Sequence, residues 1–176
     1  NDVFDLNDDF DENDIISGGD GNDELRVDNN VVDTDFGGVT SVEIFTQTES
    51  GNAVLGTMAQ AAGINQIRFD RTGNENNTID ASAMTNDLRF IANYDSSLGG
   101  GGSDTLTGGS GDDLFNMAAG FENGNDEIVG GDGFDEIKVR GDTSVDSNIS
   151  VEFTEVELLT LGSAIGGKPG DVNGNQ

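Results

Sequence analysis

Glycine and aspartate residues recur in a nine-residue pattern that places backbone carbonyls beside carboxylates. Residues 99–116 read GGGGSDTLT followed by GGSGDDLFN, two adjacent copies of G-G-x-G-x-D-x-U-x, where U is a large apolar residue. The same frame recurs at Gly18 (GGDGNDELR) and at Gly130 (GGDGFDEIK), and a degenerate copy, FENGNDEIV, occupies residues 121–129. Closely spaced carbonyl and carboxylate oxygens are the ligands that Ca²⁺ accepts, about 6 to 8 at a time.

Each position of the pattern has a physical role. We expect glycines at the first, second and fourth positions to allow φ > 0, so that the chain turns sharply with its carbonyls pointing inward. The sixth-position aspartate adds an anionic oxygen, although an Asx-turn that only stabilises the bend is the alternative role for a single copy. The eighth-position residue should point into the interior from a short strand, as expected for Leu106, Phe115, Ile128 and Ile137.

The choice of calcium follows from the ligands that the chain offers. It contains no His and no Cys, so soft and borderline metals have no preferred ligands, and Mg²⁺ requires a tighter octahedron than a glycine loop favours. Two carboxylates about 4 Å apart repel each other by roughly 4 kcal/mol at an effective dielectric constant near 20. Without a cation, the bends should therefore separate.

The composition excludes several classes of protein. The 176 residues carry 7 Lys+Arg against 35 Asp+Glu, a formal net charge of −28, which disfavours nucleic acid as a partner. Such a charge also predicts disorder in the metal-free state. The sequence has no Cys for a disulfide and no apolar run as long as a transmembrane segment.

A second repeat has a much longer period. NDIISGGDGNDELRV (13–27) matches NDEIVGGDGFDEIKV (125–139) at an offset of 112 residues, and SVEIFT (41–46) matches EVELLT (155–160) at an offset of 114. The chain therefore contains about one and a half units of a tandem array, which favours a structural or surface protein over a self-contained catalyst.

The middle of the chain has the pattern of strands. Apolar clusters VEIFTQ (42–47), INQIRF (64–69) and LRFIAN (88–93) follow one another at offsets of 22 and 24 residues, with shorter apolar pieces between them. This spacing predicts the rungs of a parallel solenoid with two strands per turn. An antiparallel sandwich is the alternative, and GTMAQAAG (56–63) could form one helical turn.

We divide the chain by these textures into five segments. They are the end of one glycine–aspartate block (1–36), β-helical rungs (37–98), a second glycine–aspartate block (99–140), the start of the next β-helical unit (141–165) and a linker or tail (166–176).

The in-frame nonapeptides resemble the RTX (repeat-in-toxin, haemolysin-type calcium-binding) family. The resemblance implies an all-β, right-handed parallel β-roll or β-helix solenoid, with several Ca²⁺ ions held between glycine-rich turns stacked on the same side. It also implies secretion of an unfolded chain by a Gram-negative bacterium and folding on contact with extracellular calcium. The middle stretch is similar in texture to RTX-type S-layer proteins and large adhesins.

The family's ligand role carries over to the positions that match its motif. Aspartates at the sixth position supply side chains, Asp14 matches Asp126 through the long repeat, and Asp20 and Asp132 offer main-chain carbonyls more readily than side chains. The resulting set of metal-site residues is Asp14, Gly18, Asp20, Gly21, Asp23, Gly99, Gly101, Asp104, Gly108, Ser110, Asp113, Asp126, Gly130, Asp132, Gly133 and Asp135.

These inferences predict a calcium-binding structural module of a secreted cell-surface protein rather than an enzyme. Its partners would be calcium ions and, end to end, copies of itself or neighbouring repeats, with a surface glycan as a further candidate. The alternative is a calcium-dependent C-terminal or accessory domain, such as a carbohydrate-binding one, of a secreted RTX enzyme. The absence of His leaves no base for a hydrolytic triad.

Overall fold

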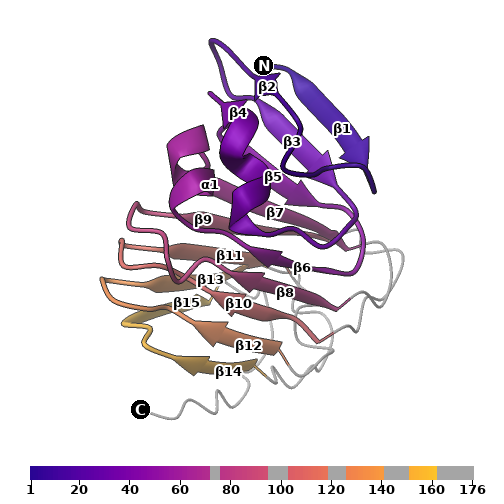
Figure 1. The fold of residues 1–176 in the computed structure, drawn as a ribbon. Coiled ribbons are helices and arrows are strands. Elements are labelled where there is room, and N and C mark those ends of the chain that lie inside the picture. Colours follow the sequence, from indigo (N-terminus) through magenta and orange to yellow (C-terminus); the bar gives the residue numbers. More distant parts are fainter. Residues whose placement is uncertain (72–75, 95–102, 119–125, 141–150, 162–176) are drawn as a thin grey trace.

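A computed structural model shows a chain built almost entirely from parallel β-strands (Figure 1). It describes residues 1–71, 76–94, 103–118, 126–140 and 151–161, to which all structural statements refer. The predicted tail, residues 166–176, lies outside this part of the chain.

The strands form two main sheets and one short pair. The eight-stranded sheet has the order β1-β3-β5-β7-β9-β11-β13-β15. Its strands span Val3–Asn7, Glu24–Val27, Ile44–Gln47, Gln66–Arg71, Arg89–Tyr94, Leu114–Ala118, Glu136–Arg140 and Leu158–Leu161. The five-stranded sheet has the order β14-β12-β10-β8-β6. In chain order these strands are Gly51–Val54, Asn77–Asp80, Thr105–Thr107, Asp126–Val129 and Val151–Thr154. The short pair joins β2 (Ile16–Ser17) to β4 (Val39–Thr40).

The chain alternates between the two sides of the molecule, and each circuit makes one rung. Odd-numbered strands pair with odd-numbered strands and even-numbered with even-numbered ones, always in parallel. Phe45 of β5 pairs with Ile67 of β7, 22 residues further on, which is the interval between apolar clusters in the sequence. The prediction of a parallel β-solenoid is therefore confirmed, and the antiparallel sandwich is excluded.

The core lies between the sheets and is filled by every second residue of each strand. One inward column runs through Leu25, Phe45, Ile67, Phe90, Phe115 and Ile137, and all six side chains are buried. Phe90 and Phe115 stack with ring centroids 4.5 Å apart. The eighth-position residues of the nonapeptides, Leu106, Phe115, Ile128 and Ile137, are buried as predicted.

Two short helices fill the N-terminal part of the solenoid. The 3₁₀-helix η1 (Asp33–Gly38) places Phe36 in the core, with its ring centroid 5.8 Å from that of Phe45. The helix α1 (Thr57–Ala62) confirms the predicted helical turn and packs against η1. In the described part of the chain, no helix has the length and apolar character needed to cross a membrane.

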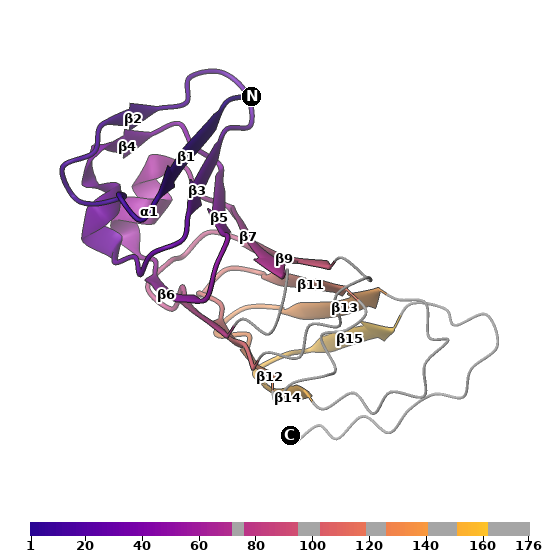
Figure 2. The same ribbon diagram turned by 90° about the vertical axis from the view of Figure 1, so that its right-hand side faces the viewer.

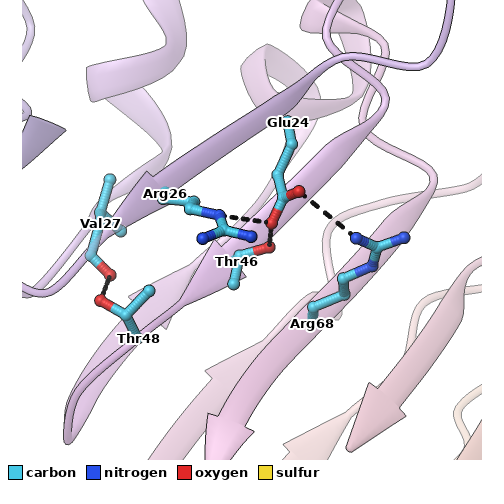
Figure 3. Close-up of polar contacts among 6 residues, drawn as sticks. All are labelled: Glu24, Arg26, Val27, Thr46, Thr48 and Arg68. Carbon is cyan, nitrogen blue, oxygen red and sulfur yellow. Dashed lines mark hydrogen bonds and ion pairs between the residues drawn. The ribbon is translucent and has the colours of Figure 1, made fainter. Parts of the chain in front are cut away.

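The strands of the eight-stranded sheet contain most of the few cationic residues. Six of the seven Lys and Arg residues lie in its strands: Arg26, Arg68, Arg71, Arg89, Lys138 and Arg140. Figure 3 shows Glu24 between two of them, 2.9 Å from Arg26 Nε and 3.4 Å from Arg68 Nη1, while Thr46 donates a 2.7 Å hydrogen bond to the same carboxylate. Lys138 contacts Glu136 at 2.6 Å. Carboxylates of the same sheet thus pair with Arg26, Arg68 and Lys138.

Candidate metal sites

Three of the nonapeptides form bends that join an even-numbered strand to the next odd-numbered one. We name them the Gly18 bend (residues 18–23), the Gly108 bend (108–113) and the Gly130 bend (130–135). The last two stack directly, because the N–H of Gly108 donates to the carbonyl of Val129 at 2.9 Å. Bends of successive rungs therefore lie on one edge of the solenoid.

The first glycine of each bend is required by the closeness of the next rung. A Cβ on Gly108 would lie 2.2 Å from the carbonyl oxygen of Gly130, and a Cβ on Gly130 would lie 1.8 Å from that of Glu155. The prediction that this first glycine adopts φ > 0 is wrong, since neither Gly108 nor Gly130 is among the described residues with positive φ. Glycine is needed at this first position because a carbonyl oxygen of the next rung occupies the place that a side chain would take.

Glycines at the second and fourth positions do adopt the predicted backbone conformation in two bends. In the Gly130 bend, φ is +107° at Gly131 and +126° at Gly133, and in the Gly18 bend it is +82° at Gly19 and +134° at Gly21. All four values lie in the region that L-residues other than glycine rarely adopt. These two positions therefore turn the chain, as the sequence predicted.

Each sixth-position aspartate binds the preceding rung through one carboxylate oxygen. On the bend edge, Asp113 Oδ1 accepts the N–H of Leu88 at 2.8 Å, and Asp135 Oδ1 accepts the N–H of Asp113 at 2.8 Å. On the opposite edge, Asp104 Oδ1 accepts the N–H of Asn77 at 2.9 Å, and Asp126 Oδ1 accepts the N–H of Asp104 at 2.8 Å. The aspartates thus form ladders that join successive rungs, a role beyond that of a local Asx-turn.

The second carboxylate oxygen points into the bend of the same aspartate. A Cβ on Gly18 would lie 2.7 Å from Asp23 Oδ2, and one on Gly130 would lie 2.5 Å from Asp135 Oδ2. Both side chains are fully buried, and in the structure neither Oδ2 atom has a hydrogen-bond partner. Leaving a buried charged oxygen without a partner is costly. A cation in the bend would remove that cost.

The electrostatics of the stacked bends also favour a cation. Burial raises the pKa of Asp113 to about 6, and the charges of Asp135 and Asp87 act in the same direction, against hydrogen bonds that lower it. Burial likewise raises the pKa of Asp135 to about 6, with further repulsion from Glu157. Both carboxylates therefore hold a proton more tightly than usual when no ion neutralises them.

An ion in these bends would depend mainly on backbone oxygens. Among the described residues, no group of three or more Asp or Glu side chains is placed to hold one ion. One or two carboxylates per bend must therefore be completed by carbonyls and water, a ligand set that suits Ca²⁺ with its flexible coordination. The buried, partnerless oxygens and the carbonyl-lined bends fit calcium in this respect.

The remaining predicted site residues are placed less centrally. Asp20 and Asp132 are exposed. Ser110 is exposed too, and its N–H donates to the carbonyl of Met84 at 3.1 Å. Asp14 is half-exposed and accepts the N–H of Asp11 at 2.9 Å. It therefore stabilises a local turn, whereas Asp126, its match in the long repeat, joins two rungs. Gly99 and Gly101 lie outside the described residues.

Two glutamates that the sequence did not single out take part in the ladders. Glu157 Oε2 accepts the N–H of Asp135 at 2.7 Å, and Glu43 Oε2 accepts the N–H of Asp23 at 2.9 Å. They belong to EVELLT and SVEIFT, the segments that match at an offset of 114 residues. That long repeat was the available signal, but neither segment contains the nonapeptide pattern.

The close approach at the first glycine leads to a testable prediction. We expect Gly130→Ala to lower the free energy of unfolding by about 1–3 kcal/mol or more, because its Cβ would overlap the Glu155 carbonyl. Gly37→Ala is the matched control, since no atom lies within 4 Å of the position of its Cβ and its φ is not positive. Urea denaturation in excess calcium measures both, and equal stabilities would contradict the described stacking.

Comparison with known proteins identifies the repeat. The family model of the RTX calcium-binding nonapeptide repeat matches in four copies, over residues 11–30, 95–120 and 122–141. Neither a curated protein nor a solved structure matches the chain. The matched residues include all three described bends. The chain thus carries RTX calcium-binding nonapeptide repeats, and these repeats form the bends that stack along the edge of its β-solenoid.

Proposed function

We propose that the chain is a calcium-binding structural module of a secreted bacterial cell-surface protein, of the S-layer or adhesin kind. It folds and assembles when it meets extracellular calcium. The observation that carries this proposal is the buried Oδ2 atom of Asp23 and of Asp135, which faces a glycine bend without a hydrogen-bond partner. We assign the module no enzymatic activity of its own.

Calcium would act on this fold through linkage between binding and folding. If only the folded chain binds calcium, each independent site contributes roughly 2.7 kcal/mol when the free ion is near 100 times its Kd. Extracellular calcium sites have Kd values on the order of 10⁻⁴ to 10⁻³ M, so they are mostly empty in cytosol and filled outside. A chain with a net charge of −28 could thus remain extended until it leaves the cell.

The ends of the sheet support a role in a larger array. β1 and β15 are the first and last strands of the eight-stranded sheet, and in the described structure each has a single neighbouring strand. Open strand edges are templates for pairing with further strands. Neighbouring repeats or further copies of the chain would extend the solenoid there, as the two copies of the long repeat suggest.

A calcium titration tests the coupling of binding and folding. We expect the far-ultraviolet circular dichroism of the chain to be that of an extended chain in excess chelator and of a β-rich protein in millimolar calcium. Magnesium at the same ionic strength is the control and should not produce the transition. A spectrum that is already β-rich in chelator and unchanged by calcium would refute the proposal.

The dependence of calcium binding on pH provides a second test. Burial raises the pKa of Asp113 and of Asp135 to about 6. Protonation of these carboxylates therefore stabilises the ion-free fold below about pH 4, and this stabilisation is lost as the pH rises through 6. Calcium needs the ionised carboxylates, so protons compete with it. The gain in the free energy of unfolding from a fixed calcium concentration, measured by urea denaturation, should therefore be smaller at pH 5 than at pH 7.5. An equal gain at both pH values would show that these carboxylates do not bind the ion.

A further inference from the structure

Two short turns follow the glycine bends and lack the nonapeptide pattern. Residues 41–43 connect β4 to β5 and stack on the Gly18 bend, and residues 155–157 connect β14 to β15 and stack on the Gly130 bend. Both lie outside the residues that match the RTX repeat. We name them the Glu43 turn and the Glu157 turn.

The two turns contact their bends in the same way. In each pair of bend and turn, the N–H of the bend's first glycine donates to the backbone carbonyl of the threonine before the turn. The donor Gly18 binds Thr40 and the donor Gly130 binds Thr154, both at 3.0 Å. A Cβ on Gly18 would lie 1.9 Å from the carbonyl oxygen of Ser41, matching the 1.8 Å between Gly130 and Glu155. The contact is therefore repeated in two places far apart in the chain.

The first residue of each turn adopts a backbone conformation that is unfavourable for its type. Ser41 has φ = +53° and Glu155 has φ = +54°. Residues other than glycine rarely adopt this region, and such strain persists only where the surroundings enforce it. The carbonyl oxygens of Ser41 and Glu155 lie against the first glycines of their bends. The strained residue of each turn is therefore the one that brings an oxygen to the bend.

Each turn also brings a second carboxylate to the aspartate of its bend. Glu157 Oε2 accepts the N–H of Asp135, and Glu43 Oε2 accepts the N–H of Asp23. The Oδ2 atoms of Asp135 and Asp23 are buried, point into the bends and have no hydrogen-bond partner. A bend and its turn thus present a buried, partnerless anionic oxygen, a second carboxylate and a carbonyl.

We propose that each turn closes a calcium site with the bend that precedes it. One ion would lie between the Gly18 bend and the Glu43 turn, and the other between the Gly130 bend and the Glu157 turn. Asp23 with Glu43, and Asp135 with Glu157, supply the carboxylates, and the carbonyls of Ser41 and Glu155 supply further oxygens. The inference deepens the proposed function, on which it rests, because it adds ligands from outside the nonapeptides.

The competing role for each glutamate is that of a hydrogen-bond acceptor alone. Replacement by glutamine separates the two roles, because its amide oxygen can still accept the N–H of Asp135 or Asp23 while the negative charge is lost. A purely structural glutamate should therefore tolerate the change at all calcium concentrations. A ligand should show the effect only when calcium is present.

The experiment compares the wild type with E43Q, E157Q and the double variant, using Ca²⁺ itself as the probe. Native mass spectrometry counts the bound ions, and isothermal titration calorimetry measures their affinities. We expect each single variant to lose one ion or to bind it about tenfold or more weakly, since the number of ligand charges tunes calcium affinity. The double variant should lose two. Thermal unfolding of the ion-free chain, folded in chelator by an osmolyte such as TMAO, should be unchanged or occur at a higher temperature, because repulsion with the aspartate is removed.

E152Q is the matched control, since Glu152 is an exposed residue of β14 and its replacement changes the net charge equally. If the double variant keeps the wild-type number of ions and their affinities, the turns are not ligands and the inference is overturned, while the proposed function stands. If the wild type binds no calcium, both fail. Loss of stability in chelator with osmolyte, together with unchanged calcium binding, would assign the glutamates a structural role only.

Discussion

Stacking of parallel rungs brings negative charge together at the same places where it supplies hydrogen-bond acceptors. One oxygen of Asp135 joins two rungs by accepting the N–H of Asp113, and the other is turned into a bend of backbone carbonyls. The first interaction stabilises the fold, whereas the second buries charge beside like-charged oxygens. The stability of the solenoid therefore depends on neutralising the second oxygen, by a proton at low pH or by a cation at neutral pH.

The rest of the architecture follows from this constraint. Carbonyl oxygens of each rung lie against the first glycines of the preceding rung, so the bends stack closely and fix the spacing of the strands beside them. Figure 2 shows the strands of the two sheets on opposite sides of the solenoid. Buried aromatic and aliphatic side chains fill the space between them and hold the rungs in register. Arg26, Arg68 and Lys138 pair with carboxylates of the large sheet.

The sequence predicted the solenoid because its period is visible in both patterns, the nonapeptides and the apolar clusters about 22 residues apart. It also predicted which residues enter the core, since Leu106 and Phe115 occupy a fixed position of the repeat. The reason for the first glycine was not predictable, because the carbonyl that meets Gly130 comes from Glu155, on the next rung. Glu43 and Glu157 were missed for the same reason: their place in the ladders depends on stacking and not on a local motif.

The most direct measurement is a crystal structure of the protein grown with calcium, with an anomalous difference map to locate the ions. The account predicts a calcium peak within coordination distance of Oδ2 of Asp23 and of Asp135, surrounded mainly by backbone carbonyl oxygens. Bends that contain no ion in saturating calcium, with these aspartate oxygens bound only to protein donors or water, would contradict it.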